Sequence, residues 1–271
     1  MTMFATHPIT SQRALLIDIT RCIGCRGCVT ACKAEHGLPA ESDADTELSA
    51  TALTAMVDHN DERHVRKLCM HCLDPSCASV CPVSAFKRTP EGPVTYDAKK
   101  CLGCRYCMVA CPFGVPRYEW RSVVPSVRKC DLCVGRAAQG KPPACVEICP
   151  AEATITGTRD ELLAEAHRRI AADPQDYYPQ VYGEHEVGGT SVLFLSPVPF
   201  EQLAFRTGLG DQPMPDLTWN ALEKIPGVVT MGGAALMAVY WITHRREEVA
   251  RVGANDASHA HNDKEDGHAT H

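Results

Sequence analysis

The stretch Cys101-Leu-Gly-Cys104-Arg-Tyr-Cys107-Met-Val-Ala-Cys111-Pro112 contains four cysteines at intervals of three, three and four residues, followed by a proline. Bacterial ferredoxins hold a cubane [4Fe–4S] cluster with this spacing. In ferredoxins that contain two clusters, the fourth cysteine of such a run ligates the other cluster. The stretch therefore predicts a second run of cysteines, which exchanges its own fourth thiolate for that of Cys111.

All sixteen cysteines of the chain fall into four sets of this kind. The last three sets end in Cys-Pro, whereas the first has Lys33 in place of the proline, and the fourth has eleven residues between its second and third cysteines. In chain order, the sets are Cys22, Cys25, Cys28 and Cys32; Cys69, Cys72, Cys77 and Cys81; Cys101, Cys104, Cys107 and Cys111; and Cys130, Cys133, Cys145 and Cys149. We predict four [4Fe–4S] clusters with four thiolate ligands each.

Two other uses of the cysteines fit less well. Disulfide frameworks are typical of small secreted domains, whereas this chain has 271 residues and its cysteines occur in close runs of four. Structural zinc sites use two separated CxxC pairs, and the fourth set alone resembles such a site. The other three sets are too compact. Full ligation by sixteen thiolates leaves no open iron for a substrate, which disfavours catalysis at the clusters.

Composition excludes some classes of function. The formal net charge of -6 and the pI near 6.0 predict no nucleic-acid partner. The chain contains no P-loop, nucleophile elbow or dinucleotide-binding glycine motif. Cations next to predicted ligands stabilise a reduced cluster, and the sequence offers several, among them Arg26, Lys100, Arg105 and Lys129.

The elements between the sets predict an α+β fold. Short apolar or β-branched runs predict strands at Leu15–Ile19, Val94–Asp97, Ala151–Gly157 and Val192–Leu195. Thr158 and Glu161 form a capping box that starts an amphipathic helix reaching about Ala171. We expect one helical turn near Leu48–Met56, and left-handed backbone at Gly24 and Gly27 in the first cysteine loop.

The C-terminal part predicts a membrane anchor. Pro226–Thr243 has no charged residue over 18 positions and is followed by His244-Arg245-Arg246. This length reaches the lower limit for a transmembrane helix, and Tyr240 and Trp241 suit a membrane interface. The polar residues Glu247–His271 predict a disordered tail.

The four sets resemble those of the four-cluster ferredoxin-type beta subunits of bacterial respiratory oxidoreductases, over roughly residues 14–245. Among these subunits, the chain is most similar to the ferredoxin-like subunit of membrane-bound uptake nickel–iron hydrogenases and is close to formate dehydrogenase beta subunits. The motifs that carry this resemblance are CMHCLDPSCASVCPVSA, CLGCRYCMVACPFGVPRY, KCDLC with CVEICPAEA, GTRDELLAEAHRR and YYPQVYGEHEVGGTSVLFLSPVPFEQL.

The spacing alone allows neighbouring sets to pair, but the resemblance implies that the first set pairs with the fourth and the second with the third. With the exchange of fourth cysteines, four ligand groups follow. Group A is Cys22, Cys25, Cys28 and Cys149; group B is Cys130, Cys133, Cys145 and Cys32; group C is Cys69, Cys72, Cys77 and Cys111; group D is Cys101, Cys104, Cys107 and Cys81.

The same resemblance implies two interleaved ferredoxin-like modules with two [4Fe–4S] clusters each, plus one C-terminal transmembrane helix. The predicted boundaries are 14–62 with 123–200 for the first module and 63–122 for the inserted second module. We then expect a linker at 201–224, a transmembrane helix at 225–244 and a disordered polar tail at 245–271.

The resemblance implies an electron-transfer subunit without catalysis of its own, which relays electrons between a catalytic oxidoreductase subunit and a quinone-reactive or cytochrome b-type membrane subunit. A membrane-tethered redox sensor or scaffold with structural clusters is the alternative from another class. An enzyme whose site is unrecognised is the third hypothesis.

The predicted location is the inner membrane, with a single span. The first residues, MTMFATHPITSQR, show no signal peptide, whereas the hydrogenase relative usually has a twin-arginine signal. Formate dehydrogenase beta subunits lack a signal and are exported with a catalytic partner. By that route the clusters would be periplasmic and His244-Arg245-Arg246 cytoplasmic, although Lys224 on the other flank opposes this orientation.

Overall fold

The computed structural model describes residues 12–40, 46–59, 63–123 and 126–265 of the chain. The chain forms two compact units, Met1–Leu217 and Thr218–His271. All sixteen cysteines belong to the first unit, and the described part of the second unit is helical apart from a turn at Glu223 and Lys224.

A three-stranded sheet with the order β8-β1-β9 lies at the centre of the first unit. Strand β1 (Arg13–Asp18) pairs antiparallel with β8 (Thr154–Thr158) and parallel with β9 (Val192–Leu195). Strand β1 is buried from Ala14 onward because both faces of the sheet are covered. A strand covered on both sides needs a continuous apolar run rather than an alternating one, which explains the sequence of this segment.

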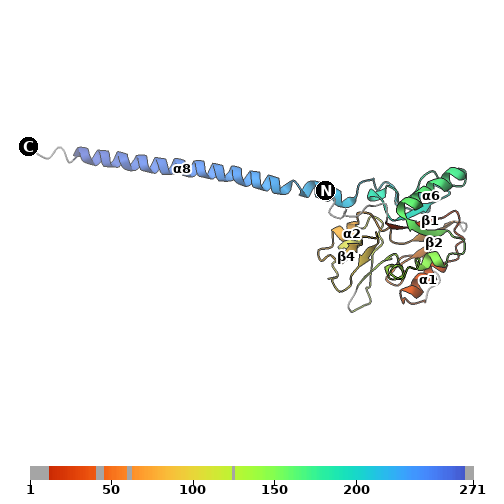
Figure 1. Ribbon diagram of the computed structural model, residues 1–271. Coiled ribbons are helices and arrows are strands. Elements are labelled where there is room, and N and C mark those ends of the chain that lie inside the picture. Colours follow the sequence, from red (N-terminus) through yellow and green to blue (C-terminus); the bar gives the residue numbers. More distant parts are fainter. Residues whose placement is uncertain (1–11, 41–45, 60–62, 124–125, 266–271) are drawn as a thin grey trace, which may run out of the picture. The chain divides into compact units, whose positions relative to one another are not determined.

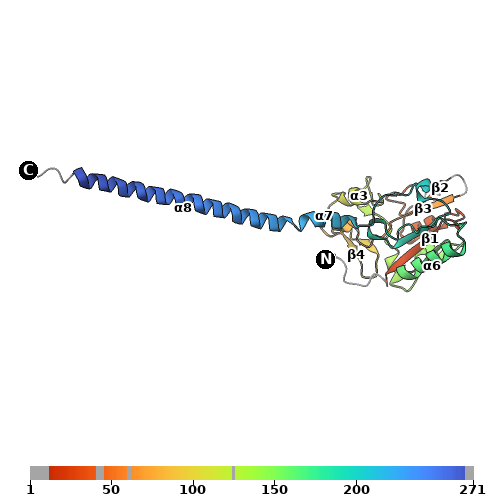
Figure 2. The ribbon, with the colours of Figure 1, turned by 90° about the horizontal axis from the view of Figure 1, so that it is seen from above.

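Helix α6 (Arg159–Ala172) covers one face of this sheet (Figures 1 and 2). Its predicted capping box is present: Glu161 N donates to Thr158 Oγ1, and Thr158 N donates to the Glu161 carboxylate at 3.0 Å. Leu162 and Ala166 pack against alternate residues of β1 and β9. The prediction of this helix from its cap and its apolar face is confirmed.

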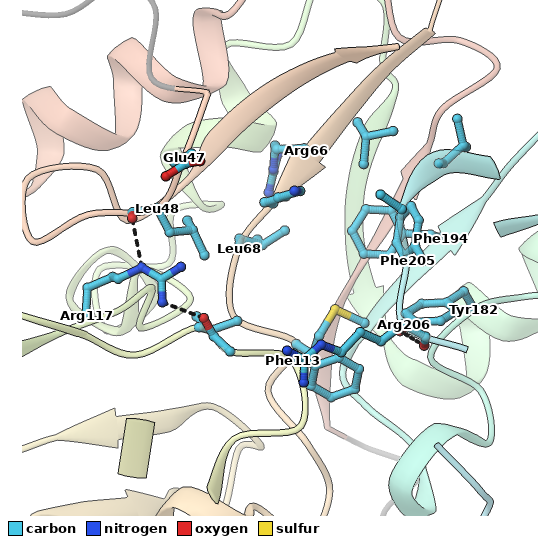
Figure 3. A pocket seen from close by; sticks show the side chains of 17 residues that line it. Glu47, Leu48, Arg66, Leu68, Phe113, Arg117, Tyr182, Phe194, Phe205 and Arg206 are labelled. Carbon is cyan, nitrogen blue, oxygen red and sulfur yellow. Dashed lines mark hydrogen bonds between the residues drawn. The ribbon is translucent and has the colours of Figure 1, made fainter. Parts of the chain in front are cut away.

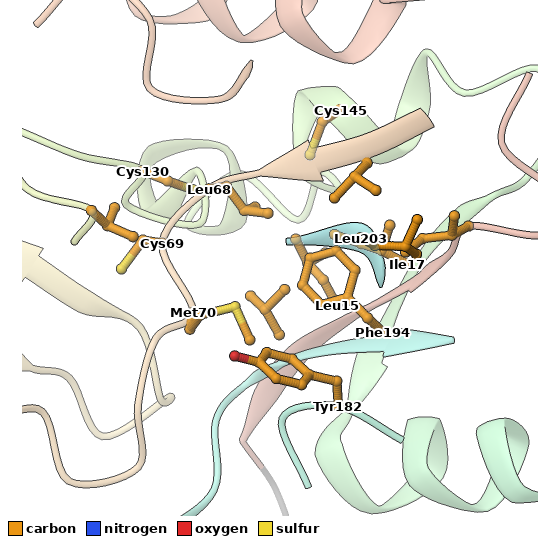
Figure 4. Close-up of a cluster of buried hydrophobic side chains, with 14 of the residues drawn as sticks. Leu15, Ile17, Leu68, Cys69, Met70, Cys130, Cys145, Tyr182, Phe194 and Leu203 are labelled. Atoms are coloured by element: carbon orange, nitrogen blue, oxygen red, sulfur yellow. The ribbon is translucent and has the colours of Figure 1, made fainter. Parts of the chain in front are cut away.

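The other face of the sheet packs against the cysteine-bearing segments. Leu15, Ile17 and Phe194 project from β1 and β9 into this core (Figure 4). The side chains that meet them come from around the second and fourth sets and include Leu68, Cys69, Met70, Cys130 and Cys145. The sheet thus positions parts of two cysteine sets that are far apart in the sequence.

Three antiparallel hairpins complete the strands of the first unit. They are β2 (Ala55–His59) with β3 (Arg63–Lys67), β4 (Phe86–Arg88) with β5 (Val94–Tyr96), and β6 (Arg117–Tyr118) with β7 (Val127–Arg128). Strand β4 follows the second cysteine set and β5 precedes the third. In the same way β8 follows the fourth set and β1 precedes the first.

Five short helices carry or follow the cysteines: α1 (Gly27–Glu35), α2 (Ser76–Ser79), α3 (Tyr106–Ala110), α4 (Val134–Ala137) and α5 (Ala144–Glu147). Helix α1 of the first set packs against α5 of the fourth, and α2 of the second set packs against α3 of the third. Within the first unit, α2 and β4 lie at one end and α1 at the other (Figure 1).

The segments on either side of β9 continue the core. They contain two 3-10 turns, η2 (Glu186–Gly188), which precedes β9, and η3 (Phe200–Leu203), which follows it. The Tyr182 ring lies 4.7 Å from the Phe205 ring and 5.2 Å from the Phe200 ring, centroid to centroid. The predicted linker 201–224 therefore begins inside the packed core, because Leu203 is buried, and its last part includes helix α7 (Met214–Leu222).

Helix α8 (Ile225–Glu265) contains the predicted transmembrane segment. Among the described residues, the structure has one helical segment long and apolar enough to cross a membrane, at Met214–Gly253, and its most apolar 18 residues have a mean hydropathy of 1.6. None of its most apolar stretch is buried by protein. Exposed apolar side chains of this kind fit a single-pass membrane anchor.

Two predictions of local structure were wrong. Residues 245–265, predicted as disordered, continue α8: they contain no proline and one glycine, Gly253, and Glu248 lies 3.5 Å from the Arg245 guanidinium one turn away. The helical turn expected near Leu48–Met56 is absent from that segment. Ser49 Oγ instead accepts a hydrogen bond from Thr51 N at 3.2 Å, a local contact that competes with helix formation.

Candidate iron–sulphur sites

The four cysteine loops share one backbone feature, although their sequences differ. The second residue after the first cysteine has positive φ in every set: Gly24 at 67°, His71 at 49°, Gly103 at 74° and Leu132 at 59°. In two sets this residue donates its backbone N–H to that cysteine, from Gly103 to Cys101 Sγ and from Leu132 to Cys130 Sγ, both at 3.4 Å. Such bonds to sulphur tune the potential of a bound cluster.

Glycine is favoured at position 24 for two reasons. Its φ of 67° is costly for other residues, and a Cβ there would lie 2.4 Å from Cε1 of His64. The expectation for Gly27 was wrong, since Gly27 begins helix α1 and the left-handed residue is Arg26, at φ 59°. Arg105 has the same role before α3, at φ 64°.

A second repeat follows the fourth cysteine of the last three sets. After Cys-Pro and one further residue, φ is positive at Ser84, Gly114 and Glu152. This turn directs the next N–H back to sulphur, from Ala85 to Cys81 Sγ at 3.2 Å and from Val115 to Cys111 Sγ at 3.5 Å. The first set lacks the proline, and its helix α1 runs on past Cys32 to Glu35.

The thiols of groups A and B line two separate hollows. Cys22, Cys25, Cys28 and Cys149 surround one. Cys32, Cys130, Cys133 and Cys145 surround the other, together with Arg66. In both cases a cysteine from a set more than 90 residues away along the chain joins the three remaining thiols.

The thiols of groups C and D also have one another as charged neighbours. Burial, and then the charges of Cys69, Cys111 and Cys77, raises the pKa of Cys72 well above its ordinary value. Burial likewise raises the pKa of Cys107 to about 11, with contributions from Cys101, Cys104 and Cys81. Cys111 therefore lies near the second set and Cys81 near the third.

Burial makes these thiols poor acids in the absence of a metal. It raises the pKa of Cys32 to about 12 and of Cys77 to about 12, and neighbouring thiols add to both shifts. Thiolates are the ligands of iron–sulphur clusters, and metal binding releases their protons. Bound iron would hold such buried, closely spaced thiols in the thiolate form.

Two buried donors test whether the surroundings fit such a cofactor. His71 Nδ1 accepts a hydrogen bond from Val94 N at 3.0 Å, so the remaining proton is on Nε2, which has no partner among the described residues. Arg66 Nε is also buried without a partner there. Buried donors need acceptors, and cluster and thiolate sulphurs provide them, so the residues present fit iron–sulphur clusters.

The cations predicted from the sequence differ in whether they lie at the surface or are buried. Arg26 forms an ion pair with Asp58 at the surface, and Arg105 lies 5.1 Å from the Trp120 ring centroid. Lys129 is buried and close to Cys77. Sequence reasoning missed Arg66, which is buried beside Cys145. A lone arginine in a short strand is usually exposed, so the sequence contained no signal for it.

An open pocket of about 340 Å³ borders the same region (Figure 3). Phe113, Phe205 and Tyr182 form part of its apolar wall. Arg117 is fixed at its edge, donating to Leu48 O at 2.8 Å and to Gly114 O at 2.6 Å. No predicted site residue lines this pocket.

Comparison with known proteins gives consistent family assignments. A family described as a 4Fe-4S dicluster domain matches residues 61–159. A Nitratidesulfovibrio vulgaris protein is 42% identical over 251 residues, covering 87% of this chain and 68% of that protein. The hydrogenase-2 operon protein HybA of Escherichia coli O157:H7 is 40% identical over 241 residues, covering 72% of this chain and 73% of HybA.

The formate dehydrogenase iron-sulfur subunit of Haemophilus influenzae is 34% identical over 247 residues, covering 83% of this chain and 78% of that subunit. The resemblance drawn from the cysteine motifs is thereby confirmed. The chain belongs to the family of ferredoxin-type [4Fe–4S] proteins that includes HybA and the formate dehydrogenase iron–sulphur subunits.

Proposed function

We propose that this chain is the electron-transfer subunit of a membrane-bound hydrogenase or formate dehydrogenase type complex, with four [4Fe–4S] clusters held by groups A to D. Bound clusters supply one-electron transfer with little rearrangement. The observation that carries the proposal is that the four groups of thiols adjoin one another in series and that each end of the series has one exposed cysteine.

The serial order A, B, C, D rests on neighbouring thiols of different groups. Cys28 of group A has Cys145 of group B as a charged neighbour. Cys130 of group B has Cys69 of group C as a neighbour, and Cys77 of group C has Cys107 of group D. A linear order of this kind suits a relay better than four independent structural clusters would.

The exposure of the cysteines at the two ends of the series also supports a relay. Of the sixteen cysteines, Cys25 of group A and Cys104 of group D are exposed, and the others are buried or intermediate. Each lies beside an exposed apolar side chain, Ile23 and Leu102, both 62% exposed. Electrons would enter and leave at these two ends, where partner subunits cover the apolar surface.

The partners follow from the family and from helix α8. HybA and the formate dehydrogenase subunits are named for hydrogenase and formate dehydrogenase systems, so we assign a catalytic subunit of that class to one end. A quinone-reactive membrane subunit is assigned to the other, because the candidate span at Met214–Gly253 would anchor the chain in the same membrane. We keep the proposal that the clusters are periplasmic and residues 244–246 cytoplasmic.

The test is extraction of the chain from its native membrane in mild detergent, with its partners attached. The proposal predicts about sixteen iron and sixteen sulphide per chain, four for each cubane, and a large catalytic subunit that co-purifies. Adding the substrate of that subunit should reduce the clusters, as followed by EPR, and adding an oxidised quinone should reoxidise them.

Each part of this result can fail separately. A zinc content in place of iron would eliminate the clusters. A chain that contains iron, but has no co-purifying catalytic subunit and is not reduced by a catalytic substrate, would instead favour the sensor or scaffold.

A further inference from the structure

Two buried cations in the first unit lie close to predicted ligand thiols. Arg66 on β3 is 2% exposed, and Lys129, directly after β7, is 8% exposed. Another buried arginine, Arg169, has the carboxylate of Asp18 at 2.9 Å. Among the described residues, no carboxylate forms an ion pair with Arg66 or Lys129. Their counter-charge must therefore come from elsewhere.

The Arg66 guanidinium contacts a thiol of group B and lines the hollow that the group A thiols surround. Its Nη1 donates to Thr154 Oγ1 at 3.1 Å and its Nη2 to Cys145 Sγ at 3.4 Å, while Nε has no partner among the described residues. The charged groups with the largest influence on it are the thiols of Cys145, Cys28 and Cys130. One cation thus lies between thiols of two ligand groups.

The Lys129 ammonium lies on the side of groups C and D. It donates to the backbone oxygen of Val94, at the start of β5, and to Cys130 O at 2.8 Å. It lies 6.0 Å from the centroid of the Phe86 ring on β4 and stabilises the thiolate form of Cys77. Backbone oxygens alone are weak compensation for a buried charge.

Burying a cation costs several kcal/mol unless opposite charge is nearby. Among the described residues, the charged groups with the largest influence on Arg66 are cysteine thiolates, and a cluster bound by them becomes more negative by one charge on reduction. A fixed buried cation therefore favours the reduced form, with less screening than at the surface.

The two cations are exchanged between the pairs of sets. Strand β3 leads into the second set, but its Arg66 donates to Cys145 of group B and lies beside the group A thiols. Strand β7 leads into the fourth set, but Lys129 after it donates to Val94 of β5 and influences Cys77. Each entering segment thus supplies the cation of the other pair. The exchange links the two pairs through electrostatics as well as through packing.

We propose that Arg66 is a positioning residue that raises the reduction potentials of the clusters held by groups A and B, and that Lys129 does the same for group C. This inference rests on the proposed four clusters. It concerns residues that are not ligands, and its readout is a potential rather than turnover.

The experiment is an EPR-monitored redox titration of the intact complex with Arg66→Met, Arg66→Lys and Arg66→Gln. Lys67→Met is the matched control, because Lys67 is the next residue of β3, is exposed and lies on the opposite face of the strand. Lys129→Met is the companion variant.

Arg66→Met should lower the reduced-to-oxidised ratio of two signals at a fixed ambient potential by roughly tenfold, which corresponds to about 59 mV for a one-electron couple. Lys129→Met should lower the ratio for a different signal. Arg66→Lys should restore most of the shift, and Lys67→Met should leave all signals in place.

Unchanged potentials in an Arg66→Met protein that retains its iron would overturn the inference while leaving the proposed function intact. If Arg66→Met fails to hold iron, Arg66→Gln is titrated instead. Gln retains a donor and removes the charge, so lowered potentials support the electrostatic role and wild-type potentials overturn it. Too little iron in the unaltered complex would instead contradict the proposed function itself.

Discussion

The first and fourth cysteine sets pack together through α1 and α5, and the second and third sets pack together through α2 and α3 around the two-stranded hairpin of β4 and β5. Cys69 of the second set also contributes to the core on the face of the three-stranded sheet opposite α6. We call the two parts of the unit the sheet-side half (β1, β8, β9, α6 and the first and fourth sets) and the hairpin-side half (β4, β5 and the second and third sets). On the α6 face of its sheet, the sheet-side half has a core of apolar side chains to which no cysteine contributes, between β1, β9 and α6. In the hairpin-side core, cysteines are a large share of the buried residues, with Cys77 and Cys107 packed on Phe86 and Val94.

The difference indicates where each half obtains its stability. An isolated two-stranded hairpin is marginal in water, and a small core needs metal or disulfide support. The hairpin-side half should therefore depend on its clusters for folding. The sheet-side half has a helix, three strands and a buried charge pair, and should retain structure without them.

Removal of the clusters should have the largest effect. After oxidative loss and chelation of iron, we expect amides of β4 and β5 to lose protection from hydrogen exchange, while those of β1 and β9 stay protected. Hydrogen exchange with mass spectrometry measures both in one sample. Equal loss of protection in the two halves would show that the comparison is wrong.

Replacement of a single ligand comes next. Cys111→Ser should remove chiefly the cluster of the second set, held by group C, because Cys111 lies near Cys69 and Cys72. The matched variant Cys81→Ser should instead remove the cluster of the third set. EPR spectra of the two variants show which cluster signal each one loses, and so test whether the second and third sets exchange their fourth cysteines. Loss of the third set's cluster in Cys111→Ser would refute this exchange.

The buried charge pair tests the sheet-side half directly. Asp18 is fully buried and accepts hydrogen bonds from Arg169 Nη1 at 2.9 Å and from Tyr177 Oη at 2.8 Å. Asp18→Asn should destabilise the unit by about 3 kcal/mol, since it leaves a buried guanidinium without its full counter-charge. Guanidinium-induced unfolding, followed by circular dichroism, measures the change.

The exposed Asp160 in the first turn of α6 is the control for that substitution. Asp160→Asn should change the free energy of unfolding by less than about 0.5 kcal/mol. Similar effects of the two substitutions would mean that the buried pair contributes little.

The smallest expected effect concerns the cap of α6. Thr158→Ala removes the acceptor of the Glu161 backbone N–H and should cost about 1 kcal/mol. Thr158→Ser keeps the acceptor and should be nearly neutral. In Thr158→Ala, the clusters of groups C and D could lose their absorption at a lower denaturant concentration than in the unaltered protein. That result would mean that the two halves unfold together rather than separately.

Local features of this protein were predictable from the sequence because their causes are local. The cysteine spacing sets the loop around each triad of thiols, the Thr158–Glu161 pair starts α6, and the uncharged run after Lys224 fits the apolar part of α8. The continuation of α8 to Glu265 was missed, because a polar composition does not by itself distinguish a solvated helix from a disordered tail.

The four cysteine sets and their spacing follow directly from the sequence. The proximity of distant cysteines depends on the tertiary fold: β1 and β8 pair across about 140 residues, and Cys149 and Cys22 line the same hollow. The tertiary fold also decided that Arg66 is buried among thiols. Both depend on contacts between distant segments, which no local spacing or periodicity can specify.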